Sequence, residues 1–75
     1  MKNIKVLGFT VTPEVEAACL KRMRKSWFRA KQITDVAWDH PNVTFELAIR
    51  ISDRLIQRER KAGNIMRFGG GWIRS

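Results

Sequence analysis

Residues 55–75 read LIQRERKAGNIMRFGGGWIRS, and this stretch governs how the rest of the chain is interpreted. A helical pattern leads into it, and Gly63 is expected to end that helix in the manner of a left-handed C-cap. The segments 64–67 (NIMR) and 72–75 (WIRS) are predicted to be strands joined through FGGG, because glycines allow the positive φ angles of a tight hairpin. The stretch therefore predicts a long helix followed directly by a two-stranded hairpin.

The helix that leads into the hairpin is predicted over 43–62, and its residues separate into an apolar and a polar side. The apolar side consists of Phe45, Leu47, Ala48, Ile49, Ile51, Leu55, Ile56 and Ala62. The polar side consists of Glu46, Arg50, Asp53, Arg54, Gln57, Arg60 and Lys61. Ser52 and Glu59 fall on the apolar side, and Asn42 or Thr44 is expected to cap the helix.

A shorter helix is predicted upstream, over 31–38, with Ile33, Val36 and Ala37 facing the core. Pro41 ends this pattern because a proline disfavours the helical conformation of the residue before it. That residue, His40, is therefore predicted to lie in a turn. Trp38 and Phe28 are expected to pack in the core or between helices.

The first helix is predicted over 13–27, with Thr12 as its cap and Pro13 at its first position. Its apolar arc holds Val15, Cys19, Leu20, Met23 and Trp27, so Cys19 is interpreted as a small core residue. The cluster Lys21, Arg22, Arg24 and Lys25 either extends a phosphate-binding track or maintains solubility. A strand is predicted before this helix, over 4–11, where Gly8 marks a bulge or a close backbone approach.

The composition indicates a single basic domain spanning 1–75. Fifteen Lys and Arg against seven Asp and Glu give a net charge of +8, which favours a polyanionic partner: nucleic acid, an anionic membrane or an acidic protein. No apolar run approaches the roughly 18 residues of a membrane span, and no signal peptide is predicted. The lone cysteine excludes an internal disulfide and favours a reducing cytoplasm.

The sequence predicts neither an enzyme nor a metal or cofactor site. It contains one histidine and one cysteine, which are too few for a structural zinc site with its roughly four ligands. No Ser–His–Asp set, paired carboxylates in a plausible cleft or phosphate-binding glycine motif is present.

The order of elements from residue 28 onward resembles a winged helix-turn-helix DNA-binding domain, and residues 55–75 carry the likeness. Gly63 and Ile65 match the glycine and apolar residue that often follow the recognition helix of such domains. The glycines at 69–71 fall where the wing tip lies, and residues 72–74 fit the returning strand. Glu59 departs from the pattern, because an apolar residue is usual there. The first strand and helix also resemble the start of small prophage or plasmid-borne proteins.

The resemblance implies an α+β fold: a small winged helix of three helices with a C-terminal β-hairpin wing and an N-terminal strand. It also implies a transcriptional regulator or accessory DNA factor that binds double-stranded DNA. Because the major groove admits one helix, the polar side of the helix over 43–62 is expected to enter it. Base contacts are predicted for Thr44, Glu46 and Arg50, with Arg54 and Gln57 divided between bases and phosphates.

Three further cations complete the predicted interface. Arg67 and Arg74 flank the glycine hairpin, which lacks bulky side chains, and are expected to contact phosphates or the minor groove. Lys31 is expected to bind a phosphate beside the first amides of the short helix. Dimerisation on a repeated half-site would increase specificity, with Leu47, Trp72 or Phe9 available for the contact.

Several alternatives stay open. The polar helix side is equally typical of a solvated surface, and the hairpin of a plain ribbon that closes a small sheet against the first strand. A protein-interaction module that binds an acidic protein partner is the second functional hypothesis. RNA binding is the third, although no aromatic-rich RNA-recognition sheet is visible.

Overall fold

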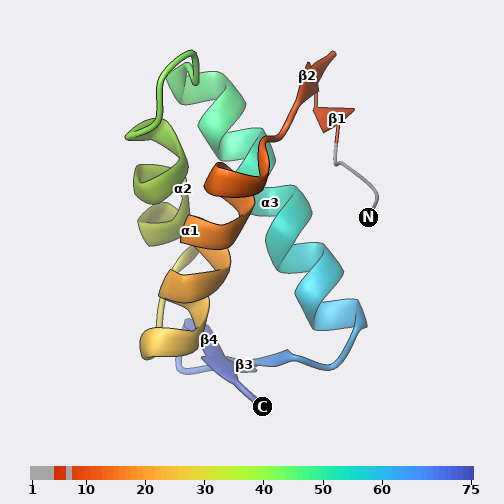
Figure 1. Cartoon of the computed structure of the whole chain (residues 1–75). Coiled ribbons are helices and arrows are strands. Elements are labelled where there is room, and N and C mark those ends of the chain that lie inside the picture. Colours follow the sequence, from red (N-terminus) through yellow and green to blue (C-terminus); the bar gives the residue numbers. More distant parts are fainter. Residues whose placement is uncertain (1–4, 7) are drawn as a thin grey trace.

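The computed structural model describes residues 5–6 and 8–75, and it shows an α+β protein (Figure 1). Three helices come first: α1 Pro13–Lys25, α2 Ala30–Trp38 and α3 Phe45–Lys61. The strands β3 Ile65–Phe68 and β4 Gly71–Arg74 follow and pair antiparallel. The predicted combination of three helices with a C-terminal hairpin is confirmed.

The N-terminal stretch differs from the single strand predicted over 4–11. Two short strands, β1 Lys5–Val6 and β2 Phe9–Thr10, pair antiparallel in a sheet of their own. Gly8 lies between them with a φ of +79°, a conformation that reverses the chain and that glycine adopts easily. Residues 4 and 7 of the predicted strand lie outside the described residues, so a continuous N-terminal strand is not seen.

The helix starts follow the predicted caps. The Thr12 hydroxyl accepts a hydrogen bond from the Val15 amide at 3.3 Å, and the Thr44 hydroxyl accepts one from the Leu47 amide at 3.2 Å. Each bond satisfies an amide that has no partner within the helix. Gly63, with a φ of +80°, follows the end of α3 as predicted. Because Thr44 caps α3, Val43 precedes the helix, which runs over Phe45–Lys61 rather than 43–62.

The first helix ends two residues before the predicted position. Ser26 is extended, with φ −168° and ψ −179°, which releases the chain from α1 at Lys25. Phe28 then lies beside β4: its amide donates to the Trp72 carbonyl at 3.0 Å and its carbonyl accepts from the Trp72 amide at 2.8 Å. Trp27 therefore belongs to the α1–α2 connection and not to the apolar arc of α1.

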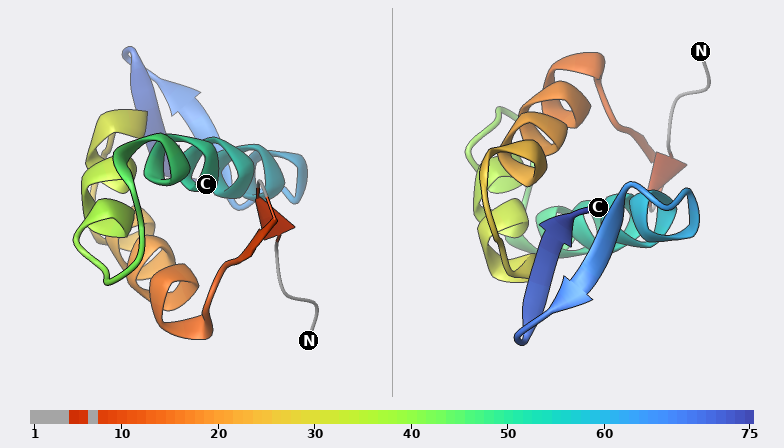
Figure 2. Two further views of the ribbon diagram at one scale, coloured as in Figure 1. Left: turned by 90° about the horizontal axis from the view of Figure 1, so that it is seen from above. Right: turned by 90° about the horizontal axis from the view of Figure 1, so that it is seen from below.

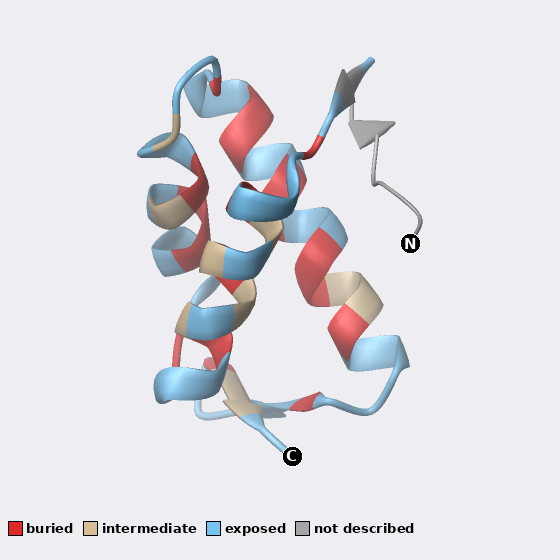
Figure 3. Ribbon diagram, viewed as in Figure 1, coloured by how far each residue is buried: buried red, intermediate tan, exposed pale blue. Residues whose placement is uncertain are grey.

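The core lies between the three helices (Figure 3). Phe28, Ile33, Ile51 and Leu55 are fully buried, and Val15, Cys19 and Met23 of α1 pack against them in the same cluster. These positions agree with the predicted apolar sides. Val36 and Leu20 are partly buried at the edge of this cluster.

The start of α3 contradicts the predicted apolar side. Phe45 is 51% exposed and Ile49 is 44% exposed, because they lie at the edge of the buried arc where the neighbouring helix α2 ends. Trp38, the last residue of α2, is itself 51% exposed and packs against Phe45 of α3, which agrees with the predicted packing between helices and not with a core position. Ala62, the residue after α3, is exposed as well.

A polar pair joins α2 to α3 inside the core. The Thr34 and Ser52 hydroxyls lie 2.7 Å apart, and they also reach the Ala30 and Ile49 carbonyls of their own helices. Ser52 thus occupies the apolar side of α3 without an unsatisfied oxygen, which is the condition for burying a hydroxyl at low cost.

We expect Ser52→Ala alone to lower the free energy of unfolding by about 1–2 kcal/mol, because the Thr34 hydroxyl is left buried with one partner fewer. Adding Thr34→Val should recover part of this loss, because neither hydroxyl then remains. Urea titration of both single variants and the double variant measures the coupling. Additive losses would contradict a direct bond.

Cys19 is a buried core thiol, as predicted. Burial, with a smaller contribution from the Glu16 carboxylate, raises the pKa of the Cys19 thiol to about 11. The thiol therefore stays protonated near neutral pH, and the thiolate is the form that reacts.

We expect Cys19 to react with a disulfide reagent at pH 8 on the order of 100-fold more slowly than in the urea-unfolded chain, from the pKa difference.

The raised folded pKa of the Cys19 thiol also means that the unfolded chain loses this proton first. The contribution of the Cys19 thiol to the free energy of unfolding is therefore complete below about pH 9 and declines as the pH rises toward 11. Urea titrations of wild type and Cys19→Ala at pH 7 and pH 10 measure this decline. An equal pH dependence in both proteins would contradict it.

Candidate nucleic-acid interface

The charges of the protein are segregated along its length. Residues 35–53 contain four carboxylates, Asp35, Asp39, Glu46 and Asp53, but a single cation, Arg50. This segment includes the end of α2 and the start of α3, which lie opposite the hairpin in Figure 1. Most of the excess positive charge therefore lies toward the hairpin end.

The hairpin end gathers cations from every neighbouring element. They are Lys21, Arg22, Arg24 and Lys25 of α1, Arg29 and Lys31 around the start of α2, Arg54, Arg58, Arg60 and Lys61 of α3, and Arg67 and Arg74 of the strands. Such a concentration of one sign of charge produces a positive potential that attracts polyanions. It defines the hairpin end as the candidate interface.

The hairpin closes through a two-residue turn. Phe68 pairs with Gly71, so only Gly69 and Gly70 lie between the strands, with φ angles of +53° and +79°. Positive φ at both central residues is the signature of the type I′ turn that matches the twist of the strands. The predicted glycine turn is therefore confirmed, although Phe68 and Gly71 belong to the strands.

The third glycine serves a different purpose. A Cβ atom at Gly71 would lie 2.5 Å from the Phe28 carbonyl oxygen and 2.6 Å from the Trp27 ring. The Trp27 indole N–H also donates to the Phe68 carbonyl at 2.7 Å. The hairpin is thus held against the α1–α2 connection by close backbone approach and by hydrogen bonds.

The attachment of the hairpin excludes one alternative from the sequence. Within the described residues 5–6 and 8–75, β3 and β4 form a two-stranded sheet separate from β1 and β2, so no sheet closed against the N-terminal strands is seen there. Their further backbone pairing is with Phe28, a single residue between α1 and α2.

The hairpin tip and the exposed side of α3 border the same side of the molecule. The buried side of α3 contacts α2 through Ser52 and α1 through Arg58, whose guanidinium lies 2.9 Å from the Glu16 carboxylate. In both views of Figure 2 the hairpin tip projects past α3, away from the start of α1. The hairpin tip therefore lies on the side of α3 that faces away from the start of α1.

The predicted site residues of α3 are accessible to different degrees. Glu46, Arg50 and Arg54 are exposed, whereas Gln57 is half-buried. The Gln57 side-chain oxygen accepts from the Arg60 guanidinium at 2.9 and 3.2 Å, which leaves its amide group to donate. The Thr44 hydroxyl is engaged by the α3 cap.

The other predicted cations surround the hairpin. The Arg67 guanidinium lies over the Trp72 ring, 5.2 Å from its centroid, which orders this side chain by a cation–π contact. Arg74 is exposed at the end of β4, and Lys31 is exposed at the second position of α2. Of the residues predicted for a dimer contact, Leu47 is buried and Trp72 is half-buried against the core. The side chain of Phe9 lies outside the described residues.

Glu59 departs from the winged-helix pattern, and its surroundings show how the carboxylate is accommodated. Glu59 as a residue is 9% exposed on the buried side of α3, and its carboxylate accepts from the Asn64 side-chain amide at 3.1 Å and the Arg58 guanidinium at 3.2 Å. These partners replace the apolar contact expected there. Arg58 and Arg60 were absent from the predicted site, and the density of cations before Gly63 is the signal that could have indicated them.

No helix in the described part of the chain has the length and apolar character to cross a membrane. The described residues also contain no group of His, Cys, Asp or Glu side chains placed to hold a metal ion. No protein-family model, curated protein or solved structure matches the chain.

Proposed function

We propose that this protein is a small double-stranded DNA-binding protein of the winged helix-turn-helix type, a transcriptional regulator or an accessory DNA factor. The observation that carries the proposal is the cationic hairpin end, where the hairpin tip projects past α3 and away from the start of α1. A duplex presents phosphates on both edges of its major groove, so a helix and a flanking hairpin of positive charge suit it.

In this arrangement α3 enters the major groove with Arg50, Arg54 and Gln57. Arg reads guanine through two hydrogen bonds, and the free Gln57 amide would donate to a base acceptor. Glu46 would have to accept from a cytosine amino group. Glu46 lies among other carboxylates, which repel phosphates. DNA contacts are therefore favoured in the C-terminal half of α3. The Thr44 hydroxyl is already used by the helix cap, so its role would be limited.

The hairpin would lie on the adjacent backbone or in the minor groove. Arg67 would supply a charge there, with its orientation fixed over the Trp72 ring. Lys31 and Arg74 would neutralise neighbouring phosphates.

Fluorescence polarisation with a random duplex, repeated across salt concentrations, tests this function. If six cations each contact one phosphate, the slope of log affinity against log salt is about −5. Once a preferred site has been selected, Arg50→Ala should weaken binding to that site by about 1–3 kcal/mol more than binding to random duplex. An undiminished preference in Arg50→Ala would contradict the groove assignment.

The alternative function, a module that binds an acidic protein, gives the opposite result. It predicts no duplex binding at about 0.1 M salt, where charge interactions still act over about 10 Å. It also predicts recovery of one defined protein after nuclease treatment.

A further inference from the structure

The end of the molecule opposite the hairpin carries an exposed apolar patch, here called the aromatic corner: Trp38, Phe45 and Ile49. Trp38 and Phe45 are each 51% exposed, and their ring centroids lie 4.8 Å apart. Ile49, one turn after Phe45, is 44% exposed. Large apolar side chains that gather on a surface are typical of a contact with another molecule.

The aromatic corner is set in negative charge. Asp35 and Asp39 lie beside Trp38 on α2 and its C-cap, and Glu46 and Asp53 lie beside Phe45 and Ile49 on α3. All four carboxylates are exposed. A partner of this corner must therefore combine an apolar floor with positive charge.

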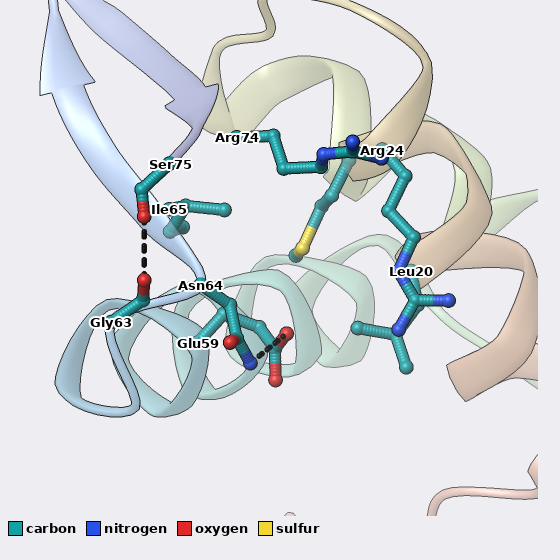
Figure 4. A pocket seen from close by; sticks show the side chains of 9 residues that line it. Leu20, Arg24, Glu59, Gly63, Asn64, Ile65, Arg74 and Ser75 are labelled. Atoms are coloured by element: carbon teal, nitrogen blue, oxygen red, sulfur yellow. Dashed lines mark hydrogen bonds between the residues drawn. The ribbon is translucent and has the colours of Figure 1, made fainter.

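A surface of that kind lies at the other end of the same molecule, here called the cationic groove. Its lining includes Leu20, Met23 and Arg24 of α1, Trp27, and Ile73 and Arg74 of β4, with Glu59 and Asn64 on its far side. Two adjoining hollows of about 290 and 220 Å³ form it and share Met23, Arg24 and Arg74. Figure 4 shows the larger hollow, with the Arg24 and Arg74 side chains on one side and Glu59 and Asn64 on the other.

The two guanidinium groups of the groove are available for a carboxylate. The ion pairs among the described residues join Arg58 to Glu16 and to Glu59, so neither Arg24 nor Arg74 takes part in them. Glu59 lines the larger hollow, but its carboxylate already accepts from Arg58 and Asn64. The groove therefore presents unneutralised positive charge around apolar side chains.

We propose that this protein self-associates head to tail, with the aromatic corner of one copy seated in the cationic groove of the next. Trp38 and Phe45 would bury apolar area against Leu20, Trp27 and Ile73, which are partly exposed, and this burial is the main favourable term. The neighbouring carboxylates would meet Arg24 and Arg74, whose planar groups bind carboxylates through two hydrogen bonds.

The positions of the two surfaces determine the kind of assembly. They lie at opposite ends of the molecule (Figure 1), so each copy retains one free corner and one free groove after a contact forms. Such a heterologous contact produces an open chain of copies unless its rotation closes a ring. A symmetric dimer is not expected.

Sedimentation velocity of nucleic-acid-free protein over a range of concentrations tests the proposal. The weight-average mass should rise with protein concentration. It should fall again at about 0.5 M salt, because salt screens the rim charges. A protein that remains monomeric at low salt up to about 1 mM would overturn the proposal.

Two double variants each disrupt one of the two surfaces. They are Arg24→Glu/Arg74→Glu in the cationic groove and Trp38→Ser/Phe45→Ser in the aromatic corner. All four side chains are exposed, so the fold should survive, and circular dichroism checks this. Each variant alone lacks one half of the contact and should stay monomeric. Their equimolar mixture should form a one-to-one heterodimer and nothing larger, since only one productive contact remains.

A matched control is Lys21→Glu/Lys61→Glu, which changes the net charge equally but lies outside the groove lining. It should associate within about threefold of wild type at 0.15 M salt. An equal loss in this control, or a mixture of the two variants that stays monomeric, would overturn the proposal. Because DNA is absent throughout, either outcome is independent of the proposed DNA binding.

Discussion

Gly71→Ala should lower the free energy of unfolding by about 2–3 kcal/mol, the largest stability effect expected at an exposed hairpin. The added methyl would lie 2.5 Å from the Phe28 carbonyl oxygen, which is a backbone atom and cannot rotate away. It would also meet the Trp27 ring at 2.6 Å. Relief requires the hairpin to move off the α1–α2 connection, which weakens the paired bonds between Phe28 and Trp72.

Thermal and urea unfolding measure this loss, which corresponds to a fall in melting temperature of roughly 8–24 °C for a domain of this size. Gly70→Ala is the matched control: its φ is +79°, but nothing lies within 4 Å of a Cβ at that position. Only the conformational cost of about 1 kcal/mol applies there. Equal losses in the two variants would contradict a cost from close approach at Gly71, whose φ is not positive.

The helices could be predicted because local signals determine them. Thr12, Thr44 and Gly63 act within a few residues of the ends that they define, so caps and periodicity locate all three helices. The early end of α1 depends instead on a contact between residues far apart in sequence. Ser26 is extended so that Phe28 can pair with Trp72, and no local pattern contains that information.

The apolar pattern of α3 predicted correctly which side of the helix is buried, but not how far along the helix that side is covered. It identified Leu47, Ile51 and Leu55 as core residues, and all are buried. It could not show that α2 ends beside Phe45 and leaves that side chain exposed. Periodicity gives the direction of an apolar stripe, whereas the length of the neighbouring helix decides how much of the stripe is covered.

The candidate interface was predictable in composition more than in arrangement. Arg50 and Arg54 of α3 were predicted from the sequence, and Arg67 and Arg74 were expected beside the glycine turn, but Arg58 and Arg60 were not. The partner of Arg58, the Glu16 carboxylate, lies 42 positions earlier, so its ion pair could not be inferred. The acidic character of residues 35–53 was visible in the sequence, but its position at one end of the protein required the fold.

Arg50→Glu/Arg67→Glu should weaken duplex binding by about 100-fold at 0.15 M salt, the largest effect expected on the proposed function. The pair removes one cation from the exposed side of α3 and one from the hairpin, and it places a carboxylate near the phosphate at each position. Each lost contact is worth about 1.4 kcal/mol if it accounts for a factor of ten. The salt slope should change from about −5.4 to about −3.6, because two fewer phosphate contacts release counterions.

The control is Lys21→Glu/Lys25→Glu on α1, which lowers the net charge by the same amount on a different element. It should weaken binding less than about tenfold and leave the slope near −5, because screening confines each charge to about 8 Å at this salt concentration. Polarisation titrations with one random duplex compare the two proteins directly. If the α1 pair caused the larger loss, the duplex would be bound by the basic cluster of α1, and α3 and the hairpin would not form the DNA-binding surface.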